Sequence, residues 1–254
     1  HSRQKTMECV VGRLLGSIFC LGSLACGPLP TDNSFIEIEG TWATPWGDEV
    51  ISSEQWQTAT IISFDNETNT AITQMPADDE FNPNAYSKLR WTEPVNGAFH
   101  YCTVAFGQTT DLDAENAADT SDASDLDGEG CGGFAWTSMR EPLAISGSWT
   151  SEFSEETITS QSWDSGFGVT AVRDWSNSDQ WVITQNAADA EFGPNTFNSV
   201  FWTDGANGTI YHCTGSFGHE TIDAAQTALA NQPDATQPEE SGCGDFAWTQ
   251  LDPR

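Results

Sequence analysis

Hydrophobic and polar residues alternate along several short stretches of the chain, which is the period expected of a β-strand with one buried face. In residues 36–42 the alternation places Ile36, Ile38, Gly40 and Trp42 on one face. Short runs at 58–64 and 70–74 are typical of two strands joined by a turn. The pattern predicts six antiparallel strands in this half of the chain, with residues 133–136 as a candidate seventh.

Residues 86–107 carry the clearest hairpin pattern. Two alternating runs flank an Asn-Gly pair at 96–97, and Asn-Gly is the preferred pair for a two-residue type I′ turn. Counting back from that turn places Trp91 opposite Cys102, and the equivalent hairpin places Trp202 opposite Cys213. A tryptophan beside a bridged cysteine is a reasonable core pair.

The second half of the chain repeats the first. Residues 72–107 align without gaps on residues 183–218, and tryptophans recur at 42/149, 56/163, 91/202 and 136/248. The repeating unit of about 110 residues is too long for a solenoid. We therefore predict two β domains, 35–141 and 142–254. The fold class is all-β, two tandem copies of a six-to-eight-strand antiparallel meander, each a small lipocalin-like barrel or a flattened sandwich.

The first residues resemble a secretory signal. Basic residues precede a short apolar run at 14–25 that ends in small residues, and this run is too short for a stable membrane span. We expect 1–25 to be a signal peptide, with Met7 as an alternative start, and 26–34 to be a linker. Cys26 is a candidate for lipidation, although Ser23 and Ala25 would equally suit ordinary signal cleavage.

Four cysteines remain after the leader, and an even number in an exported chain indicates disulfides. We pair Cys102 with Cys131 and Cys213 with Cys243, because a duplicated unit favours bridges complete within each copy; pairing across the copies is the alternative. Each bridge would then close one acidic loop and contribute about 3–4 kcal/mol in the chain-entropy model. In the second loop Ile222, Ala225 and Leu229 fall on one side of a short helical pattern.

The segments IEIEGTW, EFNPNAYSKLRWT, FHYC and CGGFAW resemble an uncharacterised family of exported bacterial lipoproteins with Trp-rich β repeats. The resemblance covers nearly all of the first copy and, more loosely, the second, where Phe197 replaces Tyr86 and Ser199 replaces Lys88. It implies a β fold and export, and no activity. Separately, the Gly-x-Trp of the first strand is similar to the opening of lipocalin-type barrels.

The charge excludes some partners. The chain has 38 acidic and 8 basic residues and a net charge of −30. Such a surface repels nucleic acids and anionic lipids, so we expect no nucleic-acid partner and contact with a membrane through the lipid anchor alone. The acidic surface is suited to binding cationic partners or divalent ions, or it serves only to keep the protein soluble.

The residues that could form a metal site or a catalytic site can each also be explained by a structural role. Asp125 and Asp127 could hold Ca²⁺ weakly, but the spacing is not that of an EF-hand and a solvated loop explains it as well. A pair of acids recurs in the segments ADDEFNP and ADAEFGP, yet acids two residues apart do not straddle a glycosidic bond. In the structural alternative an Asp caps the turn, Phe81 packs into the core and Pro83 directs the exit. The paired acids are Asp78, Glu80, Asp189 and Glu191.

Histidine and tryptophan complete the set of candidates. His100-Tyr101 becomes Tyr211-His212 in the second copy, which argues against a histidine site shared by both. Trp46, Trp175 and Trp181 have no tryptophan counterpart, so exposed rings there could bind a ligand. We expect a non-catalytic binding protein without cofactor, whose ligand is a small molecule, a glycan or a partner protein. A carboxylate-dependent hydrolase and a structural envelope protein are the alternatives.

Overall fold

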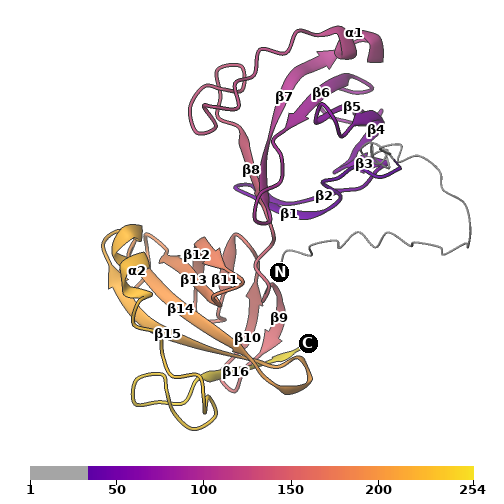
Figure 1. Ribbon diagram of the computed structural model, residues 1–254. Helices are drawn as coiled ribbons and strands as arrows, with labels where there is room; N and C mark the ends of the chain where they lie inside the picture. Colours follow the sequence, from indigo (N-terminus) through magenta and orange to yellow (C-terminus); the bar gives the residue numbers. More distant parts are fainter. Residues whose placement is uncertain (1–33) are drawn as a thin grey trace, which may run out of the picture. The chain divides into compact units, whose positions relative to one another are not determined.

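The alternating stretches form sixteen strands in residues 34–254, the part of the chain that the computed structural model describes (Figure 1). They make two closed antiparallel barrels of eight strands each, connected in chain order. The tandem all-β fold predicted from the sequence is therefore confirmed, and the barrel replaces the sandwich.

The strands of the first barrel are β1 (Gly40–Thr44), β2 (Gly47–Ile51), β3 (Gln55–Trp56), β4 (Ala59–Asp65), β5 (Thr70–Gln74), β6 (Tyr86–Trp91), β7 (Ala98–Gln108) and β8 (Thr137–Arg140). Those of the second are β9 (Gly147–Thr150), β10 (Glu155–Ile158), β11 (Ser162–Asp164), β12 (Val169–Ser176), β13 (Trp181–Asn186), β14 (Phe197–Asp204), β15 (Ile210–His219) and β16 (Thr249–Pro253). The last strand of each barrel pairs with its first, through Ala43 and Arg140 in one and Asp252 and Thr150 in the other.

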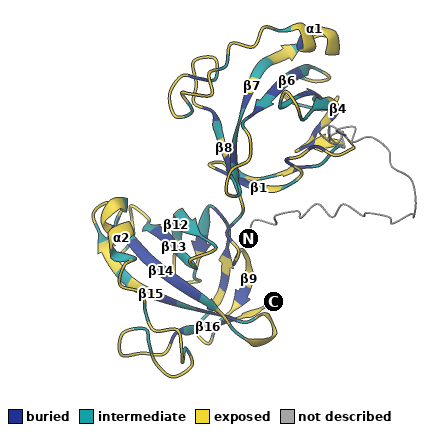
Figure 2. Ribbon diagram, in the orientation of Figure 1, coloured by how far each residue is buried: buried dark blue, intermediate teal, exposed yellow. Residues whose placement is uncertain are grey.

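Most buried residues lie on the barrel strands, whereas the loops between strands are mostly exposed (Figure 2). In β6 every second residue is buried, from Ser87 through Leu89 to Trp91. Trp91 packs with Phe99 and Met139 in the first core. Because burial of this kind removes large apolar surfaces from water, it is the main force that closes the barrel.

A folded segment, rather than a strand, precedes β1. Ile36 and Ile38 are buried, but the chain turns between them and β1, and the Trp42 Nε1 donates to the Ile38 carbonyl at 2.8 Å. The prediction of a strand from residue 36 was therefore wrong in its start. The alternation arises because the segment packs into the core from one side. Ile145 and Trp149 repeat the same contact at 3.0 Å in the second barrel.

The predicted seventh strand at 133–136 is also wrong. Phe134 is 76% exposed and lies in a tight bridge with Cys131, and β8 starts only at Thr137. Gly132 and Gly133 have φ of 62° and 96°, which turns the chain there instead of extending it.

The hairpin turn is confirmed, but its register differs from the prediction by one residue. Asn96 and Gly97 both have positive φ, as a type I′ turn requires. However, Trp91 lies opposite Tyr101, not Cys102. The shift falls between Thr92 and Val95, where Pro94 has no N–H to donate to the ladder.

The second hairpin differs in the same direction, because its turn takes three residues, Ala206–Gly208. Trp202 therefore lies opposite His212, and Cys213 lies opposite Phe201. This register decides which side chains face the interior. Residues opposite each other share a face, so Tyr101 and His212 point inward with the tryptophans.

The predicted disulfides are confirmed as Cys102–Cys131 and Cys213–Cys243. Each ties the long connection after β7 or β15 back to its own barrel. These connections begin with short helices, α1 (Asp111–Asn116) and α2 (Ile222–Ala228), whose first turns are capped by Thr110 and Thr221. In α2 the predicted side is confirmed, because Ala225 is fully buried and Leu229 packs against the core.

Candidate functional site

The three tryptophans expected to bind a ligand lie in different environments. Trp46 stands in the turn between β1 and β2 with 78% of its surface exposed, and Phe153 occupies the equivalent turn of the second barrel. Trp181 is partly buried against the core that holds Phe201. Trp175 lies against Arg140, as described below. The structure therefore does not gather these three rings into one site.

The four candidate carboxylates lie in the loop between β5 and β6, which holds Asp78 and Glu80, and in that between β13 and β14, which holds Asp189 and Glu191. Each loop has its own pair and belongs to its own barrel. They do not line either cavity inside the barrels.

The structural explanation of these loops needs one correction. Asp79 caps the turn, accepting hydrogen bonds from the amides of Phe81 and Asn82 at 3.0 and 2.6 Å. Phe81 does not pack into the core, since it is 80% exposed, as is Phe192 in the second barrel. Both loops therefore expose their phenylalanine to solvent.

Other candidate positions fall in loops or outside the described chain. Asp125 accepts a hydrogen bond from the Glu129 amide at 2.9 Å, and Asp127 lies in the same exposed loop. Within residues 34–254 no group of three or more His, Cys, Asp or Glu side chains is arranged to hold a metal ion. Cys26, with the leader, lies outside the described residues.

The first barrel contains a cavity of about 190 Å³ at one end of its interior. Glu49, a half-buried residue of β2, lines it. Trp56 Nε1 donates to Glu49 Oε2 at 3.0 Å, and the Tyr101 hydroxyl donates to Oε1 at 3.2 Å. Burial and the Glu49 charge raise the pKa of Tyr101, so the phenol remains a donor at neutral pH. Thr73, Ser87, Leu89 and Thr103 are among the other residues of the wall.

The second barrel contains a cavity of about 270 Å³ at the equivalent place. Glu156, 5% exposed, accepts a hydrogen bond from Trp163 Nε1 at 2.7 Å. Burial raises the pKa of Glu156, and the hydrogen bonds from Trp163 and Ser151 oppose that rise. The wall residues match those of the first barrel position by position: Thr184, Asn198, Val200 and Thr214.

His212 takes the place of Tyr101 in this second cavity. Its ring lies 5.0 Å from that of Trp163, as the ring of Tyr101 lies 5.0 Å from that of Trp56. Both ring nitrogens of His212 are buried, and no described residue is a hydrogen-bond partner to either. Burial lowers the pKa of His212 to about 4, so the ring is neutral at pH 7, with one donor and one acceptor.

Glu49 and Glu156 were not among the site residues predicted from the sequence, and a histidine site shared by both copies was not expected. A signal was present, because Glu49 lies seven residues after Trp42 and seven before Trp56, and Glu156 has the same spacing within the second copy. The histidine does change face between copies, as expected. That change places His212 inside its barrel, where a tyrosine stands in the other.

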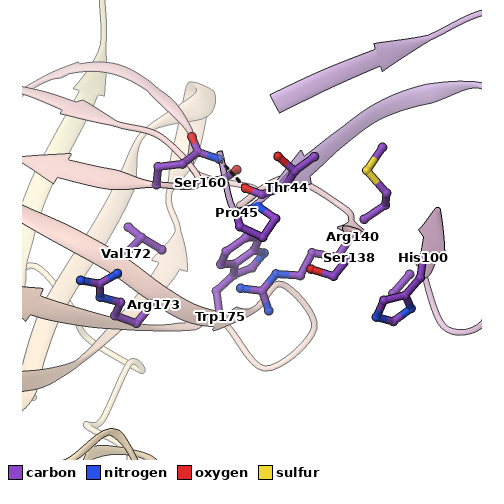
Figure 3. Close-up of a pocket in the computed structure, with 13 residues that line it drawn as sticks. Thr44, Pro45, His100, Ser138, Arg140, Ser160, Val172, Arg173 and Trp175 are labelled. Carbon is purple, nitrogen blue, oxygen red and sulfur yellow. Dashed lines mark hydrogen bonds between the residues drawn. The ribbon is translucent and has the colours of Figure 1, made fainter. Parts of the chain in front are cut away.

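A larger cavity, of about 480 Å³, is lined by residues from both barrels and contains Trp175 (Figure 3). The Arg140 guanidinium lies 3.2 Å from the centre of the Trp175 ring and forms an ion pair with Asp174 at 2.7 Å. Gln161 donates to the Thr44 carbonyl at 3.4 Å. Since Arg140 and one face of Trp175 already have partners, this cavity has fewer side-chain groups free to contact a ligand than the barrel interiors have.

Comparison with known proteins does not identify the chain, which matches no protein-family model, no curated protein and no solved structure. Among the described residues no helix is long and apolar enough to cross a membrane. The residues of the two barrel cavities therefore have to support any functional conclusion by themselves.

Proposed function

We propose that the protein is a non-catalytic binding protein of the cell envelope, whose barrels bind a small molecule in the interior cavity. One observation carries the proposal. Both barrels keep a Trp–Glu hydrogen bond at the same place in the wall of a cavity, although many surface positions differ between the copies. Burying a carboxylate inside a barrel costs free energy because the charge leaves water, and an apolar pair would fill the same space without that cost. A Trp–Glu pair kept in both copies therefore favours a role in binding a ligand.

The composition of the cavities suits binding. Each combines an indole and aliphatic side chains with a few hydroxyl, amide or carboxylate groups, which is the usual make-up of a small-molecule pocket. Glycoside hydrolysis needs two carboxylates on either side of the bond, and each cavity is lined by one, Glu49 or Glu156. A purely structural barrel would be expected to fill this space with side chains.

Export is the second part of the proposal. The two disulfides are typical of proteins from an oxidising compartment. A signal peptide over residues 1–25 would direct the chain there, and lipidation of Cys26 would hold it at the membrane surface. The acidic body would then stay in solution above the anionic lipids.

Native mass spectrometry of the protein purified from its source envelope tests both parts. We expect a mass that reports cleavage before Cys26, an attached lipid, two intact disulfides and a retained small molecule. The retained molecule should be lost in the double variant Glu49→Leu/Glu156→Leu and kept in Asp78→Ala/Glu191→Ala, whose carboxylates lie outside the cavities. Retention in the first variant and loss in the second would reject the barrel interior as the site.

A further inference from the structure

The two barrel cavities differ at several wall positions, and at one of them the first has Tyr101 and the second has His212. In the first, both oxygens of Glu49 receive hydrogen bonds from its own barrel, from Trp56 and from Tyr101. The phenol therefore fills the space next to the carboxylate and satisfies it. The cavity that remains is the smaller of the two, about 190 Å³ against 270 Å³.

The second cavity has the same carboxylate and the same indole, but no counterpart of the Tyr101 hydroxyl; Ser151 is the other hydrogen-bond partner of Glu156. An imidazole is shorter than a phenol, so the position that the Tyr101 hydroxyl occupies beside Glu49 has no counterpart on His212. The two buried ring nitrogens of His212 have no partner among the described residues. Buried polar atoms are nearly always paired, so an unpaired imidazole that lines a cavity indicates a group that a ligand completes.

Charge indicates which ligand fits. The cavity contains one buried carboxylate, Glu156, and neither a lysine nor an arginine lines it. Trp163 and Ser151 donate neutral hydrogen bonds to Glu156, but a buried carboxylate without a cationic neighbour still carries a desolvation penalty, which a cation beside it offsets. An anion would be repelled by Glu156 and by a chain whose net charge is −30.

We propose, on the basis of the binding function above, that the second barrel is the binding site for a small organic ammonium ion. One N–H group of the ligand donates to Glu156, where Tyr101 donates to Glu49 in the first barrel. A second N–H donates to the unprotonated nitrogen of His212, and the apolar part of the ligand packs on Trp163 and Val200. Tyr101 closes the equivalent position, so the first barrel binds this ligand weakly.

Three probes of one skeleton test the ligand class on the full chain: 2-phenylethylammonium, 2-phenylethanol and phenylacetate. Isothermal titration calorimetry at pH 7 should give one site for the ammonium, with an affinity about tenfold or more above that of the alcohol, because a hydrogen bond to a charged group is the stronger one. Phenylacetate should not bind. Equal affinity for the alcohol and the ammonium, or no binding of the ammonium at millimolar concentration, would overturn the proposal.

Exchanging the wall residues between copies tests the site. His212→Tyr should abolish ammonium binding, and Tyr101→His should raise the stoichiometry from one site to two. His100→Tyr, which gives the first copy the outward residue of the second, is the matched control and should leave binding unchanged. Circular dichroism and thermal melts report whether each variant is folded, and Glu156→Gln provides a second, smaller change that should weaken binding about tenfold or more.

Failure of this inference is distinguishable from failure of the proposed function. Binding that persists in His212→Tyr, or stays at one site in Tyr101→His, rejects the ammonium site of the second barrel. The proposed function still holds if the molecule retained from the envelope depends on Glu49 or Glu156. It fails if that molecule survives loss of both carboxylates.

Discussion

Acid should destabilise the second barrel through His212. Burial of the ring holds its pKa at about 4, below the ordinary value of 6.5, so the unfolded chain binds a proton that the folded barrel excludes. The barrel is therefore most favoured above pH 6.5, and it loses stability as the pH falls from there towards 4. Glu156 faces the same cavity and acts in the opposite direction, because burial raises its pKa.

The magnitude follows from the two pKa values of His212. Between pH 7 and pH 5, a group that moves from 6.5 to about 4 on folding changes the free energy of unfolding by about 2 kcal/mol, a roughly twentyfold change in the unfolding equilibrium. The loss would reach about 3 kcal/mol by pH 4. Carboxylates whose pKa is lowered by hydrogen bonds, such as Asp234, add to the loss mainly below that range.

Hydrogen exchange measured by mass spectrometry assigns the effect to the barrel. After correction for the intrinsic rates, protection of peptides from β14 and β15 should fall roughly twentyfold between pH 7 and pH 5. In His212→Gln, an amide at the same position, the fall should be much smaller. His100, whose pKa burial also lowers, belongs to the first barrel and is present in both proteins, so it cancels in the comparison. The same pH dependence in both proteins would refute the assignment to His212.

Three further perturbations follow from the fold. Replacing Cys213 and Cys243 by serine should lower the stability of the second barrel by about 3–4 kcal/mol, seen as a lower Tm of its transition, because the bridge closes a 30-residue separation; an unchanged Tm would contradict this. Gly97→Ala should cost about 1 kcal/mol or more in urea unfolding, since φ is +75° and the added carbon would meet Glu141; a neutral or stabilising effect would refute the turn geometry. Phe81→Ala should change the free energy of unfolding by less than about 0.5 kcal/mol because the ring is 80% exposed, whereas Phe99→Ala should lower it by about 3–5 kcal/mol. A similar loss of stability in both variants would indicate that Phe81 is buried in the core.

Local patterns in the sequence were enough for the architecture. Alternation identified most strands, the Asn-Gly pair at 96–97 identified its hairpin turn, and the duplication limited each cysteine pair to its own copy. These features act over a few residues or within one repeat, so they can be recognised without knowing how distant strands meet.

Prediction failed where local and long-range constraints differ. Residues 36–38 alternate like a strand but are buried by a turn that packs them against the core, and 133–136 has strand-like residues in a bend governed by two glycines. The hairpin register shifted by one residue at Pro94, because a missing N–H changes the ladder without changing the hydrophobic pattern.

The sequence by itself determined the class of fold, the duplication and the bridges, because each depends on residue types at short or repeated spacings. Only the tertiary structure decided which polar residues enter the barrels. A shift of one residue in register moves every side chain of a strand to the other face. That shift placed Tyr101 and His212 inside, beside Glu49 and Glu156, and left the cysteines outside to hold the loops.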